Sequence, residues 1–387
     1  MVIEKIEVFP IKIRKDYVYL GETSGTQSKF DYFLRPEYRC PYSKNMETLL
    51  VKLTDTDGVS GWGEALAPVL PEVAGLIISR LFAPVLLDRE LTDIGAVWDL
   101  LYDLMRDRGY YAGFMVDAIA AVDCALWDMA GKKAGKPIYE LLGGSRKGIP
   151  AYVSGLPVPS LEEKVQLALQ WKEKGFRAIK LQIGYGVEED LKIISALRKS
   201  LGDDVDLMVD AHWNYSVKEA VTLAHGLEAL GAAFLECPLN PEDLEGYAQV
   251  RAAVDIPIAL GEADRTRWQY DRILKMNCCD ILQPDVGRCG ISELMRISRL
   301  AKPYGKPVAP HLSVGQGGCI AATLHCDAAL ENFHGMQEFQ PTILTVANQF
   351  LAQPICCEGG MWKIPEGPGL GIVFDEEKVR YYAKQEV

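Results

Sequence analysis

The sequence predicts a (β/α)₈ barrel preceded by a smaller α+β domain, and three observations support this fold class. Polar side chains follow short apolar runs at intervals of 23 to 30 residues through the second half of the chain. A helical pattern follows each run, and one βα unit needs about that length. Residues 1–125 instead contain alternating apolar and polar positions, as antiparallel strands do. The fold class is therefore α/β with two parts.

The N-terminal region predicts an antiparallel sheet followed by helices. Residues 3–13 and 49–63 alternate, and Asp57-Gly58 is a typical hairpin turn. Helical stretches are expected around 92–108 and 114–133. We expect residues 1–130 to form an α+β capping domain.

The barrel strands are predicted from AYVSG at 151–155 to about residue 341, in eight phases. The residues at the strand ends are Lys180, Asp210, Glu236, Glu262, Asp285, His311 and Glu338. Capping boxes, Ser160 with Glu163 and Ser216 with Glu219, begin two of the intervening helices. We assign residues 131–345 to the barrel. Residues 346–387 return to short strand-like pieces and are expected to pack back on the capping domain, completing it.

The composition favours one large soluble enzyme subunit. The chain has 387 residues, 49% of them hydrophobic, which is ample for a barrel and one further domain. Its net charge of −12 is spread along the sequence, with no basic stripe for nucleic acid and no apolar run long enough to span a membrane. Ten cysteines without CxxC pairs indicate reduced, buried thiols and a cytoplasmic location.

Three acids carry the strongest chemical signal. Asp210, Glu236 and Glu262 are 26 residues apart, each at the end of a strand-like run. The carboxyl ends of consecutive parallel strands meet at one face of a barrel, so these carboxylates should converge. No cysteine or histidine stands at ligand spacing among them, and an all-oxygen set suits a hard cation. We expect a Mg²⁺ site.

Two later strand ends predict a general base. His311 at the seventh strand and Asp285 at the sixth should lie side by side, and a neutral imidazole oriented by a carboxylate suits proton abstraction near neutral pH. Glu338, at the eighth strand, is expected to donate a hydrogen bond to the substrate if burial keeps it protonated.

These residues carry a family resemblance. The GWGEA hairpin, the segment DCALWDMAGKKAGKPIYELLGG, the Asp210/Glu236/Glu262 triad and the series Asp285, His311, Glu338 resemble the enolase superfamily, within its mandelate racemase subgroup. The resemblance implies that the three acids hold Mg²⁺. It also implies that the metal binds the substrate carboxylate and stabilises the enediolate formed when a base removes the α-proton.

The second strand departs from the family pattern. Many relatives carry Lys-x-Lys there, with the second Lys as a base opposite the histidine, whereas this chain has Lys180-Leu181-Gln182. Because Gln cannot take a proton, a racemase with two bases is disfavoured. Lys180 either contacts the metal-bound substrate or pairs with the triad acids, and Gln182 becomes a substrate-binding candidate.

His212 offers a replacement acid. It follows Asp210 by two residues, so the strand period places both side chains on one face. In this respect the chain is similar to the family's galactonate and mannonate dehydratases, in which such a histidine protonates the leaving hydroxide. The alternative is that His212 is a hydrogen-bonding spacer. Trp213 is expected to wall the pocket.

Residues 17–44 match in position the capping loop of the family. Tyr19, Arg35 and Arg39 there are candidates for contacts with substrate hydroxyls or a distal carboxylate.

The sequence thus predicts a Mg²⁺-dependent sugar-acid dehydratase that forms a 2-keto-3-deoxy acid. The alternatives are an epimerase or lactone cycloisomerase acting through the same enediolate, and a non-catalytic metal-binding sugar-acid sensor. The expected partner is a small sugar acid, and the resemblance favours a homo-oligomer, either a dimer or an octamer.

Overall fold

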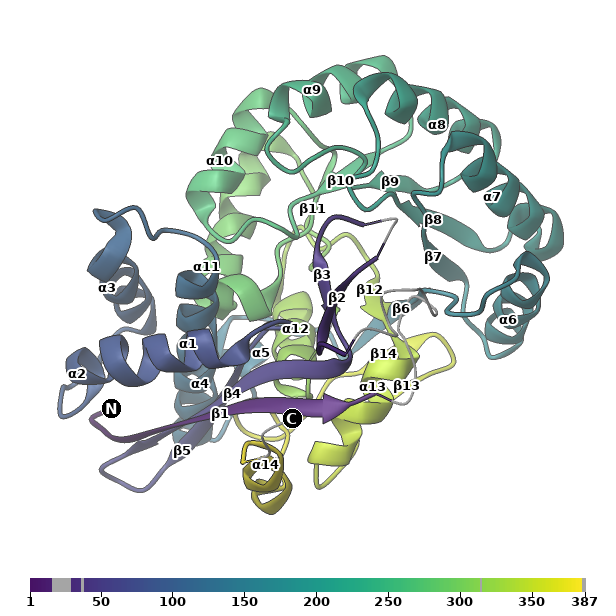
Figure 1. Ribbon diagram of the computed structural model, residues 1–387. Helices are drawn as coiled ribbons and strands as arrows, with labels where there is room; N and C mark the ends of the chain where they lie inside the picture. Colours follow the sequence, from purple (N-terminus) through teal and green to yellow (C-terminus); the bar gives the residue numbers. More distant parts are fainter. Residues whose placement is uncertain (16–28, 36–37, 314, 385–387) are drawn as a thin grey trace.

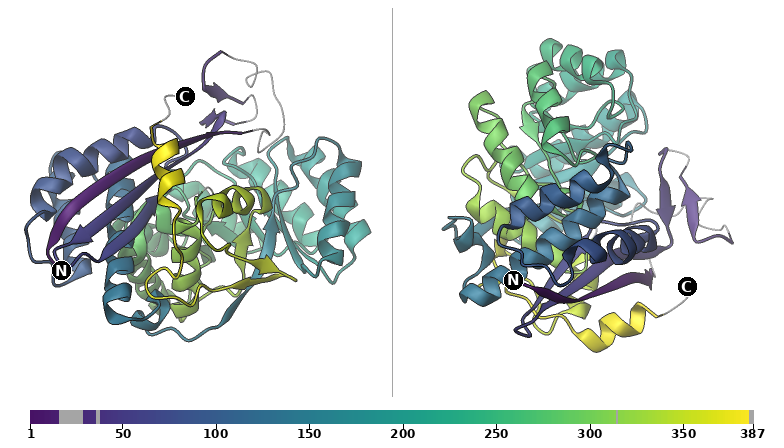
Figure 2. Two further views of the ribbon diagram at one scale, coloured as in Figure 1. Left: turned by 90° about the horizontal axis from the view of Figure 1, so that it is seen from below. Right: turned by 90° about the vertical axis from the view of Figure 1, so that its left-hand side faces the viewer.

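The computed structural model describes residues 1–15, 29–35, 38–313 and 315–384. In the capping domain, β1 (Ile3–Arg14), β4 (Asn45–Asp55) and β5 (Ser60–Ala65) form an antiparallel sheet in that order. The predicted turn is present, with Gly58 at φ 78° between β4 and β5. A short ribbon of β2 (Tyr32–Leu34) and β3 (Pro41–Ser43) projects from this sheet (Figure 2).

Helices cover one face of the capping sheet (Figure 1). They are α1 (Pro71–Ile77), the π-helix η2 (Ile78–Phe82), α2 (Ala83–Leu86), α3 (Ile94–Arg106) and α4 (Phe114–Ala134). The β5 strand lies against α4 because it carries glycines there: a Cβ on Gly63 would stand 1.9 Å from the Ala121 carbonyl oxygen. A side chain at Gly63 is therefore incompatible with this contact.

The barrel has the eight positions predicted. Its parallel strands are β6 (Gly148–Ser154), β7 (Ala178–Gln182), β8 (Asp206–Asp210), β9 (Phe234–Glu236), β10 (Ile258–Leu260), β11 (Ile281–Leu282) and β12 (Gln337–Phe339). The seventh position is held only by single bridges, from Val308 to Leu282 and Phe333 and from His311 to Asp285. Pairing of β12 with β6 closes the ring.

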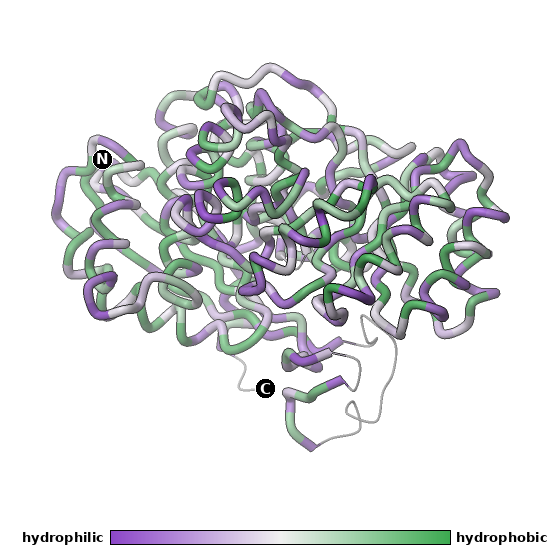
Figure 3. Tube along the Cα trace, turned by 90° about the horizontal axis from the view of Figure 1, so that it is seen from above, coloured by the Kyte–Doolittle hydropathy of each residue, from purple (hydrophilic) through white to green (hydrophobic). Residues whose placement is uncertain are grey.

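An outer layer of helices surrounds the strands (Figure 1). The layer comprises α5 (Ile138–Leu141), α6 (Leu161–Glu173), α7 (Val187–Leu201), α8 (Val217–Ala229), α9 (Leu244–Ala253), α10 (Arg267–Met276), α11 (Val286–Ala301), η3 (Lys302–Tyr304), α12 (Gly318–Ala329), α13 (Pro341–Ala347) and η4 (Asn348–Phe350). Both predicted capping boxes are confirmed, at the starts of α6 and α8. Hydrophobic and hydrophilic positions alternate along these outer helices (Figure 3), as expected for helices with one buried face.

The C-terminal segment joins both parts of the molecule. Strands β13 (Cys357–Glu358) and β14 (Met361–Lys363) form a hairpin, and β14 pairs antiparallel with β6 of the barrel. Helix α14 (Glu376–Tyr382) lies beside the capping sheet, where Arg380 forms an ion pair with Glu7 at 3.0 Å. Helix α14 therefore packs on the capping domain as expected, whereas the β13–β14 hairpin pairs with the barrel.

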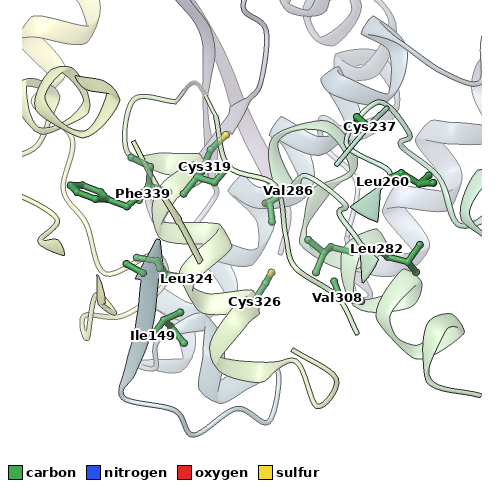
Figure 4. Close-up of a cluster of buried hydrophobic side chains, with 14 of the residues drawn as sticks. Ile149, Cys237, Leu260, Leu282, Val286, Val308, Cys319, Leu324, Cys326 and Phe339 are labelled. Atoms are coloured by element: carbon green, nitrogen blue, oxygen red, sulfur yellow. The ribbon is translucent and has the colours of Figure 1, made fainter. Parts of the chain in front are cut away.

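Buried apolar side chains of the barrel form a large core, part of which is drawn in Figure 4, and a smaller separate cluster that includes Tyr152, Met208 and Phe234. Several cysteines, including Cys237, Cys319 and Cys326, are small members of this core, while Cys40 is exposed. No helix within the described residues is long and apolar enough to cross a membrane.

Candidate active site

Three buried carboxylates meet at the C-terminal end of the barrel strands. Asp210 and Glu236 are the last residues of β8 and β9 and are paired in the strand register. Glu262 follows the end of β10 by two residues. All three are at least nine-tenths buried. We call them the acid row, in the order Asp210, Glu236, Glu262.

Cations and amides surround the acid row. Lys180 Nζ lies 2.9 and 3.0 Å from the two carboxylate oxygens of Glu236, and Gln283 Nε2 donates to Glu236 Oε2 at 2.7 Å. Burial raises the pKa of Glu236 to about 8. Lys180 acts to lower this pKa, whereas the neighbouring acids act with burial to raise it. Burial also acts on Asp210, but His212 overcomes it and lowers the pKa of Asp210 to about 2. The pKa values of two neighbouring acids of the row are therefore shifted in opposite directions.

The donor set fits a hard divalent cation. Carboxylate oxygens are the ligands that Mg²⁺ prefers, and three like charges crowded in a buried place are stabilised by a cation. Within the described residues, no group of three Asp, Glu, His or Cys side chains already has the arrangement of a metal site. Oxygens of the acid row instead contact Lys180, Gln283 and the two histidines. Binding a cation at the row therefore requires these side chains to change partners.

His311 and Asp285 form the predicted dyad. The His311 Nδ1 lies 2.6 Å from Asp285 Oδ2, and Asp285 Oδ1 accepts a hydrogen bond from the Gly287 backbone at 2.7 Å. The other ring nitrogen, Nε2, lies 3.1 Å from Glu262 Oε2. Burial lowers the pKa of His311, but Glu262 and Asp285 outweigh it and raise the pKa to about 9. Asp285 thus fixes the ring, and Nε2 points at the acid row.

Lys180 is paired with Glu338 as well as with Glu236 of the acid row. The Lys180 Nζ lies 3.4 Å from Glu338 Oε1, and both residues are 1% exposed. Burial alone would raise the pKa of Glu338, but Lys180 and His311 outweigh it and lower that pKa. The lowered pKa favours the ionised carboxylate, whereas the role of Glu338 as a hydrogen-bond donor requires a protonated carboxyl.

His212 lies at the opposite end of the row from His311. Its Nδ1 is 3.2 Å from Asp210 Oδ2, and its ring packs against that of Tyr38, with centroids 4.4 Å apart and the planes tilted by 36°. The strand ends at Asp210, and His212 and Trp213 have φ of 50° and 60°. A left-handed conformation in a residue other than glycine costs roughly 1 kcal/mol or more and is typical of functional sites. A tight turn, rather than a continued strand, places this imidazole.

These side chains open into one cavity of about 470 Å³ between the barrel and the capping domain. Eight of the residues predicted from the sequence line this cavity: Lys180, Gln182, Asp210, His212, Trp213, Glu262, His311 and Glu338. Arg35 and Arg39 are not among its lining residues: Arg35 lies 5.9 Å from the Tyr38 ring centre, and Arg39 donates to Asn240 Oδ1 at 2.5 Å. Tyr19 lies outside the described residues.

Sequence reasoning missed four residues of the site. Gln283 precedes Asp285 by two residues on the same strand end, so the strand period was an available signal for it. Arg265 lines the cavity and donates to Asp117 of α4 at 2.7 Å, a contact that joins barrel and capping domain. Lys15 and Asn45 also line the cavity, and nothing in the linear sequence marks them.

Comparison with known proteins places the chain in a family. A family model described as the mandelate racemase / muconate lactonizing enzyme N-terminal domain matches residues 41–143, and one described as enolase C-terminal domain-like matches residues 163–378. D-Galactarolactone cycloisomerase of Agrobacterium fabrum is 36% identical over 85% of this chain and 89% of the relative. Arabinonate dehydratase of Saccharolobus solfataricus is 34% identical over 87% and 91%.

Solved structures extend the likeness over nearly the whole chain. A member of the enolase superfamily from Agrobacterium tumefaciens, 36% identical, superimposes with a TM-score of 0.93 over 98% of both chains. A racemase from Streptomyces coelicolor, described with bound magnesium, is 25% identical, with a TM-score of 0.85 over 98% of this chain and 99% of that one.

Proposed function

The chain belongs to the mandelate racemase / muconate lactonizing enzyme family of the enolase superfamily, and from this premise we propose that it is a Mg²⁺-dependent sugar-acid dehydratase. The observation that carries the proposal is the placement of two histidines at the two ends of the acid row. His212 approaches Asp210 at 3.2 Å and His311 approaches Glu262 at 3.1 Å. An elimination needs a base and an acid on different parts of one substrate.

The barrel explains this placement. His212 follows the third strand, and His311 stands at the seventh position. In a ring of eight these positions are four steps apart and so face each other across the mouth. A sugar acid held over the row lies between the two imidazoles.

Asp210, Glu236 and Glu262 would hold the cation, whose positive charge would stabilise negative charge on the substrate carboxylate and would weaken the hold of Glu262 on a proton of His311. Neutral His311 then accepts the α-proton at Nε2, while Asp285 keeps the proton on Nδ1. Lys180, which lies between Glu236 and Glu338, adds charge where the enediolate forms.

His212 completes the elimination in this scheme. As the bond between the β-carbon and its oxygen breaks, protonated His212 gives its proton to the leaving hydroxide, which departs as water. The remaining enol tautomerises to a 2-keto-3-deoxy acid. The carbon framework stays intact, and no oxidant or reductant is needed.

A lactone cycloisomerase is the second candidate, favoured by the 36% identity to D-galactarolactone cycloisomerase. In a lactone whose ring oxygen is attached to the β-carbon, the leaving group is a carboxylate. A carboxylate leaves without a proton donor, so His212 would have no essential task in that reaction.

The test is a screen of sugar acids and their lactones with Mg²⁺, followed by product identification. The proposal expects a 2-keto-3-deoxy acid from open acids, detected as its semicarbazone. Ring opening of lactones with no turnover of open acids would support the cycloisomerase instead. Absence of any turnover, and of α-hydrogen exchange with deuterated solvent, would refute both and leave a sensor.

A further inference from the structure

The capping-domain side of the cavity carries a cation that the proposed chemistry does not use. Lys15 follows β1, and its backbone N–H donates to the Lys44 carbonyl at 3.2 Å, so it lies next to the first residue of β4, Asn45. Both Lys15 and Asn45 line the cavity that holds the acid row.

Within the described part of the chain, the Lys15 ammonium has no carboxylate within 4.0 Å. The ion pairs found there all involve other cationic side chains. Lys12, three residues earlier in β1, differs in this respect because it pairs with Glu72 at 2.7 Å. Burial lowers the pKa of Lys15 to about 8, and the nearby Glu47 offsets this only in part. Glu47 itself accepts hydrogen bonds from Tyr32, at 2.9 Å, and from Ser43.

Asn45 is the second unsatisfied group. Asn45 is 2% exposed, and among the residues that the structure describes neither its amide oxygen nor its amide nitrogen has a hydrogen-bond partner. A buried amide without partners destabilises the fold, and a ligand that pairs with the amide would remove this cost. The amide can donate to a carboxylate or a hydroxyl and accept from a hydroxyl.

We propose that Lys15 and Asn45 form a subsite for a second carboxylate at the far end of the substrate, so that the substrate class is an open sugar diacid rather than a monoacid. The first carboxylate is placed at the acid row by the proposed function, on which this inference rests. Asp210 and Glu262 of the acid row come from the barrel and Lys15 from the capping domain, and all three line the same cavity, so one molecule bound there can reach both sides. A volume of about 470 Å³ lies within the range usual for small-molecule sites.

The test compares diacids with monoacids of matched configuration: galactarate with galactonate, and glucarate with gluconate. With Mg²⁺ present, we expect kcat/KM to favour the diacid of a pair by at least ~10-fold, as one charge-assisted contact allows. Lys15→Met should remove this preference by raising KM for the diacid ~10- to 100-fold, with kcat and the monoacid little changed. Lys15→Arg should keep most of it.

Lys12→Met is the matched control. It removes a nearby cation of β1 that is already paired with Glu72. It should leave the preference intact, and thermal unfolding of each variant shows whether it folds. If Lys15→Met retains the wild-type preference, or if the wild type prefers monoacids, the subsite proposal is wrong.

Binding separates this proposal from the proposed function. Calorimetric titration of the Mg²⁺-loaded protein with galactarate and glucarate needs no turnover. Tighter binding of diacids that Lys15→Met abolishes would support the subsite even in a protein that dehydrates none of them. Equal binding of diacids and monoacids would overturn the subsite, whatever reaction the enzyme catalyses.

Discussion

At the scale of single residues, the two histidines have different environments, and their substitution should impair different steps of the reaction. His311 is fixed by Asp285 at 2.6 Å and presents Nε2 to the acid row, whereas His212 is held by a strained turn, by Asp210 and by the Tyr38 ring. One side chain is arranged to take a proton, and the other to give one.

His311→Asn should abolish both dehydration and exchange of the α-hydrogen with deuterated solvent, because the base is lost. His212→Asn leaves the base in place, so keto-acid formation should fall ~10²–10⁴-fold while α-exchange persists. Proton NMR of the substrate in D₂O measures both. Wild-type dehydration by His212→Asn would reduce that residue to a spacer, and wild-type exchange by His311→Asn would exclude it as the base.

Glu236 is the centre of the acid row, and its replacement tests the metal. Glu236→Gln removes one of three anionic ligands, so the Mg²⁺ concentration needed for half-maximal activity should rise by at least ~10-fold. The thermal stabilisation that Mg²⁺ gives the wild-type protein should shrink in parallel, which provides a readout independent of catalysis. Full activity of the wild type in excess EDTA would rule out the metal.

At the scale of elements, the contact between β5 and α4 depends on glycine. Gly63→Ala would push a methyl group to 1.9 Å from the Ala121 carbonyl oxygen and 2.6 Å from the Ala125 nitrogen. Because both atoms belong to the backbone of α4, the strand and helix must separate. We expect a loss of about 3 kcal/mol or more in the free energy of unfolding, measured with urea.

Gly75→Ala in α1 is the control for this substitution. Its added Cβ would meet Leu49 Cδ1 at 3.4 Å, Pro10 Cγ at 3.6 Å and Val8 Cγ2 at 3.9 Å, all ordinary contacts with side chains. Its stability should stay within ~1 kcal/mol of the wild type. Similar effects at the two positions would show that the close approach of β5 to α4 is not what requires glycine.

At the scale of the whole molecule, Glu64 of the capping sheet holds the loop after the seventh barrel position. Its carboxylate accepts hydrogen bonds from Thr48 Oγ1 at 2.7 Å, from the Cys319 N–H at 2.8 Å and from the Gln316 N–H. This loop follows the His311 segment, so one side chain joins the two domains beside the base.

Glu64→Ala would leave two buried backbone N–H groups without partners. We expect it to lower the free energy of unfolding by ~2–4 kcal/mol and to reduce kcat, because the His311 loop loses its support. Thr48→Val removes only one of the three donors and should cost about 1 kcal/mol. If Glu64→Ala is no more destabilising than Thr48→Val, this carboxylate does not join the domains.

Local patterns in the sequence determined the barrel, the acid row and the His311–Asp285 dyad. They did so because a βα unit has a nearly fixed length and parallel strands end at one face, so spacing along the chain translates directly into position around the ring. Capping boxes and the Asp57-Gly58 turn are likewise short-range signals, and both were confirmed.

Only the tertiary structure decided what depends on groups distant in the sequence. The ionisation of Glu338 depends on Lys180, 158 residues away, and Lys15 and Asn45 became site residues only when the capping sheet closed over the barrel. Burial and Coulomb interactions act through space, and their sign at a given side chain follows from which neighbours the fold brings within a few ångströms. Linear spacing carries no record of those neighbours, so these assignments required the coordinates.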